Sequence, residues 1–97
     1  MPTYVVLMNW TEKGIAAFKD SAQRAAAAEE RLRDIGITLK DIYWTVGPHD
    51  IVCVFDAADD ETLAAGLLTL GAMGYTRGTT MRAFSRSEFE QVVGRTG

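Results

Sequence analysis

The sequence predicts an α+β protein in which two helices pack on a four-stranded antiparallel sheet. Segments 4–8 and 51–55 are apolar at odd and even positions alike. Because successive strand residues point to opposite faces of a sheet, strands of this kind must be covered on both faces. Two longer segments repeat apolar residues every three or four positions, the spacing of one helix face. A chain of 97 residues has few helices to cover both sheet faces, so a second copy is the expected cover for one of them.

The first expected element is a strand over residues 3–10, which ends at the polar stretch 11–14. The next segment, 15–19, is expected to form a turn of helix. The chain then reaches Asp20 and Ser21, and either side chain has the oxygen that caps a helix N-terminus.

A long helix is predicted to follow and to run through Asp34. Its apolar positions are spaced by three, four and three residues, which places them on one face: Ala25, Ala28, Leu32 and Ile35. The charged residues lie mostly off that face: Arg24, Glu30, Arg31 and Asp34. Glu29 and Arg33 form a favourable pair one turn apart. Gly36 ends the helix, as a left-handed residue commonly does.

The second strand is predicted over residues 38–46 and the third begins at Ile51. The turn between them, 47–50, contains Pro48, which suits the second position of a type I or II turn. Because no helix separates the two strands, they are expected to form a hairpin.

A second helix is expected to begin at Asp59 or Asp60 and to run to about Met73, where Gly74 can end it. Its expected buried side is leucine-rich: Leu63, Leu67, Leu70 and Met73. The fourth strand follows over 76–84. Ser85 and Glu88 then form a capping box that opens a short helix through about Val93.

The order strand, helix, strand, strand, helix, strand predicts the topology. A right-handed crossover leaves room for the third strand between the first and second, and the fourth strand joins the free side of the first. This is the ferredoxin-like arrangement, with strand order 4-1-3-2, in a single domain over residues 1–97. The predicted central strands are the two without polar alternation. The predicted edge strands carry protective charges: Lys40, Asp41, Arg77 and Arg82.

The composition argues against several classes of function, namely nucleic-acid binding, membrane insertion and metal binding. The net charge of −3 gives no overall attraction to nucleic acid or to an anionic membrane. No apolar run is long enough for a membrane helix, and no leader pattern opens the chain. Cys53 lies in an apolar strand and is expected to be a buried structural thiol. One histidine and one cysteine do not make a zinc set, so no metal or other cofactor is expected. A cytoplasmic location fits these features.

Several segments also resemble one known family, the GYD-domain proteins. Five segments carry the resemblance in order: 4–11, 19–21, 47–50, 58–61 and 79–84. The resemblance covers nearly the whole chain and implies a dimeric α+β barrel, a homodimer whose two sheets pack face to face. The family is named after a Gly, Tyr, Asp signature at the hairpin, where this chain has His49 in the place of the tyrosine. The resemblance implies a fold and an assembly, and it implies no reaction.

The topology places polar and aromatic residues from three elements at one end of the sheet. The expected ligand-binding set is Asn9, Trp10, His49, Asp50 and Arg77. The N-terminus of the first helix points the same way with its free N–H groups. This end of the sheet is therefore the candidate small-molecule site.

Each of these residues also has a structural interpretation. His49 suits a general base near neutral pH, which makes it the catalytic candidate, but a histidine in a tight turn is often simply exposed. Asp50 and Asn9 can instead bond the neighbouring turn. Trp10 forms either a pocket wall or part of the core or dimer interface.

Three functions remain open. The favoured one is a small-molecule-binding homodimer with a sensory, carrier or accessory role. The alternative is a small enzyme without a cofactor, such as an oxygenase, isomerase or decarboxylase acting on a compact aromatic or carbonyl compound. The third is an assembly module whose dimer is itself the product.

Overall fold

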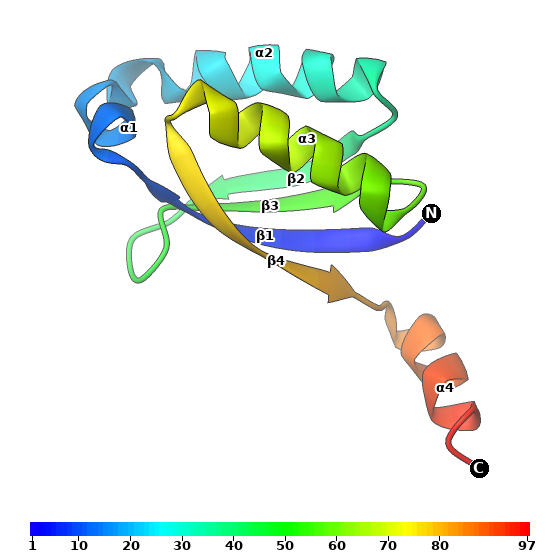
Figure 1. Cartoon of the computed structure of the whole chain (residues 1–97). Helices are drawn as coiled ribbons and strands as arrows, with labels where there is room; N and C mark the ends of the chain where they lie inside the picture. Colours follow the sequence, from blue (N-terminus) through cyan, green and yellow to red (C-terminus); the bar gives the residue numbers. More distant parts are fainter.

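The elements of the protein follow the predicted order (Figure 1). The computed structural model describes all residues from 1 to 97. The elements are β1 (Thr3–Trp10), α1 (Glu12–Ala16), the 3-10 turn η1 (Phe18–Asp20), α2 (Ser21–Asp34), β2 (Thr38–Trp44), β3 (Ile51–Asp56), α3 (Asp60–Met73), β4 (Thr76–Ala83) and α4 (Arg86–Gly94).

The four strands form one sheet in the order β2-β3-β1-β4, and all three pairings are antiparallel. This is the predicted order 4-1-3-2 counted from the other edge, so the ferredoxin-like α+β fold is confirmed. In the middle of the sheet Val5 lies opposite Val54, and Leu7 lies opposite Val52. A register shift between Leu39 and Asp41 interrupts the β2–β3 pairing.

The helices divide the molecule into two layers and an arm. Figure 1 shows α2 and α3 side by side on the same side of the sheet, and α4 projecting away beyond the end of β4. This arm contributes to the elongated dimensions of 51 × 31 × 17 Å. The chain covers one face of its sheet and leaves the other bare.

The core lies between the sheet and the two long helices. On β1 and β3 every second residue is buried on the helix side, and the residues between them are mostly half-buried on the bare side. The ten core residues are Tyr4, Val6, Met8, Leu32, Ile37, Ile51, Cys53, Phe55, Ala57 and Leu63. The strands that lack polar alternation are thus the two central ones, as predicted.

The segment between β1 and α2 differs from the prediction. The first short helix begins at Glu12, because the Thr11 Oγ1 accepts the N–H of Gly14 at 3.1 Å and so caps a helix there. A 3-10 turn follows, and α2 begins at Ser21 with no capping bond from the side chain of Asp20. The expected helical turn at 15–19 is therefore wrong in position.

Other helix ends follow the predicted chemistry. The Asp59 Oδ1 accepts the N–H of Thr62 at 2.8 Å at the start of α3, and Gly74 ends that helix with a φ of 83°. Ser85 and Glu88 form the predicted capping box of α4.

Three smaller expectations are corrected. Ile35 lies past the end of α2 and is 44% exposed, whereas Ile37 takes the buried place. The second strand ends at Trp44 rather than at residue 46. The fourth strand ends at Ala83 and leaves Phe84 exposed.

The close approach of α1 to the start of β4 gives a first test. A Cβ at Gly14 would collide with the backbone carbonyl oxygen of Tyr75, which already accepts the N–H of Thr11. Gly14→Ala should lower the free energy of unfolding by about 2 kcal/mol or more in urea denaturation, because the backbone must move. The control is Gly94→Ala, where nothing lies within 4 Å. An equally stable Gly14→Ala protein would contradict the packing of α1.

The buried thiol of Cys53 gives a second test. Its side chain is 3% exposed, and burial raises the thiol pKa from 9.0 to about 11. At pH 8 the thiolate fraction is then about 100-fold lower than in the unfolded chain, so iodoacetamide should label the native protein at least that much more slowly. The raised pKa also stabilises the native state fully below pH 9.0, and this contribution is lost as the pH rises through about 11. Mass spectrometry measures the labelling rate with and without urea. Equal rates would show that the thiol is accessible in the native protein and would contradict its burial.

Candidate functional site

Three of the predicted site residues meet at the β2–β3 hairpin. The Asn9 Nδ2 donates to the carbonyl of Pro48 at 2.9 Å, and its Oδ1 lies 2.8 Å from the Nδ1 of His49. The Asp50 Oδ2 accepts the backbone N–H of Trp10 at 2.9 Å. These bonds fasten the hairpin turn to the end of β1.

The backbone of Arg77 lies at the same end of the sheet, but its side chain extends toward α3. Its Cα pairs with that of Asn9 in the sheet register. Its guanidinium lies near the end of α3, since a Cβ at Gly71 would be 3.4 Å from the Arg77 Nη1. Arg77 borders a groove of about 350 Å³ between α3 and β4, together with the exposed Leu68. The structure therefore separates the Arg77 side chain from the hairpin network.

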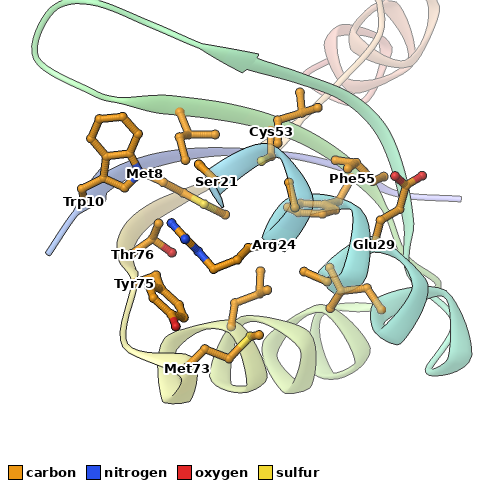
Figure 2. A pocket seen from close by; sticks show the side chains of 17 residues that line it. Met8, Trp10, Ser21, Arg24, Glu29, Cys53, Phe55, Met73, Tyr75 and Thr76 are labelled. Atoms are coloured by element: carbon orange, nitrogen blue, oxygen red, sulfur yellow. The ribbon is translucent and has the colours of Figure 1, made fainter. Parts of the chain in front are cut away.

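Trp10 lines a different space, a cavity of about 80 Å³ between the sheet and the helices (Figure 2). Thirteen of the 17 lining residues are hydrophobic, so the interior favours an apolar molecule. The sheet contributes Met8, Ile51 and Cys53, and the helices contribute Leu32 and Leu70.

The indole nitrogen of Trp10 is a hydrogen-bond donor without an acceptor. This Nε1 is buried and has no hydrogen-bond partner. An unsatisfied buried donor costs about 1–3 kcal/mol, so an acceptor that reached this nitrogen after a shift of the neighbouring side chains would recover that energy. The other tryptophan is satisfied, because the Trp44 Nε1 donates to the Oγ of Ser21 at 3.0 Å.

Arg24 supplies the only positive charge in the cavity lining. Its Nη1 donates to the carbonyl of Ala17 at 2.7 Å, and its Cζ lies 4.2 Å from the ring centroid of Tyr75. No carboxylate forms a salt bridge with it. The lining carboxylate, Glu29, instead pairs with Arg33 at 3.2 Å, and Figure 2 shows it at the far end of the cavity from Trp10.

The prediction from sequence placed Arg24 off the buried face of α2, and this is wrong. Arg24 precedes Ala28 by four residues and Leu32 by eight, so it belongs to the same helix face, and that spacing was the available signal. The long side chain packs its stem in the cavity lining while its charged end bonds a backbone carbonyl.

The bare sheet face is the second candidate site. The register pairs place Tyr43 beside Val52 and Met81 beside Val5 on this face. Tyr43 is 58% exposed and Met81 is 44% exposed, although both are large and apolar. The face is thus an apolar surface with no cover from its own chain.

The arm α4 exposes a matching apolar stripe. Phe89, Val92 and Val93 are all exposed, and their spacing of three and one residues puts them on one side of the helix. Figure 1 shows no other element packed against that helix. A stripe of this kind is typical of a helix that contacts another molecule.

Two further features bear on the kind of site. No group of three or more His, Cys, Asp or Glu side chains could hold a metal ion. None of the helices is both long enough and apolar enough to cross a membrane.

Comparison with solved structures supports the fold. TTHA0845 from Thermus thermophilus matches with a TM-score of 0.55 and 24% identity, over 88% of this chain and 95% of that one. FFRP-DM1 matches with a TM-score of 0.58 and 19% identity, over 87% of this chain and all (100%) of that one. MtbAldR matches with a TM-score of 0.62 and 16% identity, over 88% of this chain and 52% of its own chain.

Comparison of sequences identifies the family. A Thermus thermophilus protein named "Glutamine synthetase and cystathionine beta-lyase binding protein" is 32% identical over 84 residues, which cover 86% of this chain and 88% of that protein. The family model described as the GYD domain matches residues 4–93. The chain therefore belongs to the GYD-domain family.

Proposed function

We propose that the protein is a homodimeric accessory protein whose subunits pack sheet against sheet and which holds a small molecule in the cavity beside Trp10. The observation that carries the proposal is the sheet, which is apolar on both faces but covered by helices on one. Apolar surface of this extent favours contact with another molecule over contact with water.

The size of the surface indicates which parts of the chain must take part. Strands about 4.8 Å apart, with about 3.3 Å per residue, give the four-stranded face a projected area of roughly 500 Å². A stable interface buries about 800 Å² per partner. The exposed stripe on α4 supplies the missing area if the arm of each copy lies on the other copy. A second copy is thus a fitting occupant, since it brings both a bare sheet and an arm.

The small molecule is assigned to the cavity rather than to the groove beside Arg77. The cavity lies between the two layers, and Trp10 in its lining has a buried donor without a partner. In this proposal Asn9, His49 and Asp50 support the site by holding the hairpin against β1, and Trp10 contacts the ligand. A lone buried thiol such as Cys53 stays reduced in the cytoplasm, which is the location that we propose.

The accessory role rests on the relative from Thermus thermophilus, whose name states that it binds two enzymes. At 32% identity over most of both chains, a shared mode of action is a reasonable inference. The partner of this chain would then be a larger enzyme. Binding of the small molecule would change how the accessory protein acts on that enzyme.

The dimer is tested by a charge on the bare face. Val52→Lys should weaken the dimer at least about 100-fold in sedimentation velocity, because each copy buries an unpaired charge next to Leu7 and Tyr43. The monomer should still fold, since this face is open to solvent in one chain. Ala26→Lys, on the exposed side of α2, is the matched control and should dimerise normally.

The arm is examined in the same experiment. Phe89→Glu should weaken the dimer, while Gln91→Glu, on the opposite side of α4, should not. A wild-type monomer at micromolar concentration would contradict the dimer. Unchanged association of Val52→Lys would contradict the sheet-to-sheet arrangement.

The accessory role is tested by mixing the protein with glutamine synthetase and cystathionine β-lyase from its own source. Sedimentation of the mixture should show the small protein moving with at least one enzyme, and an unrelated enzyme of similar size is the control. If neither enzyme carries the protein, the accessory role taken from the relative is wrong, and the dimer is unaffected.

A further inference from the structure

We propose that the cavity between the sheet and the helices binds a small monocarboxylic acid with a short apolar chain, whose carboxylate accepts hydrogen bonds from the Trp10 Nε1 and the Arg24 guanidinium. The inference deepens, and rests on, the small-molecule binding proposed above. It follows from three properties of the cavity, namely its donors, its charge and its volume.

Two polar groups of the cavity lining can donate hydrogen bonds but cannot accept them. The indole nitrogen of Trp10 can only donate, and it is buried without a partner. The Arg24 guanidinium has five N–H groups and no acceptor, and its Nη1 bonds the carbonyl of Ala17. Figure 2 shows the nitrogen end of Arg24 directed toward the end of the cavity where Trp10 and Thr76 lie. A ligand that complements this end must present acceptor atoms.

The charge favours an anion over a neutral acceptor. Arg24 is half-buried and pairs with no carboxylate of the chain, while its cation lies over the ring of Tyr75. Glu29, at the other end of the cavity, is paired with Arg33. Hydrogen bonds between a guanidinium and a carboxylate are shorter and stronger than those to neutral acceptors. The positive end is therefore left free for an anion from outside the chain.

The volume and lining limit the rest of the ligand. A cavity of about 150 Å³ holds benzene, and this one measures about 80 Å³. On this scale the space fits a molecule of roughly three to five heavy atoms in all, the carboxylate included. Beyond the donors the walls are apolar, and the flexible side chains of Met8 and Met73 can adjust to the ligand. A short aliphatic carboxylate has this size, this apolar body and this charge.

The two tryptophans provide the readout. Each indole N–H gives one signal in a ¹⁵N-correlated NMR spectrum, and Trp44 is the internal comparison because it does not line the cavity and its N–H already has an acceptor, Ser21. Titration with propionate should move the Trp10 signal more than that of Trp44. Propionamide, which has nearly the same shape without the charge, should bind at least about tenfold more weakly.

Two variants locate the contacts. Arg24→Met keeps the stem and removes the charge, so it should weaken propionate at least about tenfold and propionamide much less. Trp10→Phe keeps a ring and removes the donor, and it should weaken both ligands; because its indole signal is gone, binding is followed on the backbone amide signals of Met8 and Cys53 in the lining. Dispersed spectra of both variants establish that they are folded before binding is compared.

The outcomes separate this inference from the proposed function. If propionate and propionamide bind equally and move the Trp10 signal, the cavity binds small molecules but the carboxylate is wrong. If neither moves any cavity signal, both the carboxylate and the small-molecule role are wrong, whereas the dimer is judged separately by sedimentation. Binding of propionate that survives Arg24→Met unchanged would also overturn the assignment.

Discussion

Two central strands that are apolar on both faces, in a chain with only two long helices, determine the rest of this structure. The helices α2 and α3 cover the face that contains Val6 and Cys53, and the face that contains Val5 and Val52 stays bare. The projecting arm α4 has the same character, because its apolar stripe has no partner within the chain. One physical requirement, the removal of apolar surface from water, thus links the bare sheet, the arm and the proposed dimer.

The cavity arises from the same packing. On its inner side α2 presents Ala25 and Ala28, whose small side chains leave unfilled volume above the sheet. Leucine at such positions would fill a core, whereas the alanines leave the cavity open. The two proposed tasks would therefore lie on opposite faces of the sheet, with association on the bare face and ligand binding on the helix side.

Local chemistry explains which features the sequence predicted. The caps at Asp59 and Ser85 depend on residues three positions apart, and the strand order follows from the order of elements along the chain and the right-handed crossover, so both could be predicted. The hairpin network around His49 followed from topology, although its hydrogen bonds indicate support rather than direct ligand contact. Arg24 was missed because a charged residue was assumed to point outward, and the cavity was missed because unfilled volume depends on how whole layers pack.

The edges of the sheet bear on how far assembly can go. The register shift on β2 and the charges of Lys40, Arg77 and Arg82 make both edge strands poor templates for a further strand. In the proposed dimer each bare face meets an identical face. This is an isologous contact, and it buries the apolar surface of both copies. Growth by strand addition is blocked and growth by face contact is self-limiting. The architecture therefore favours a closed pair over an open-ended filament, even though each chain exposes a wide apolar sheet.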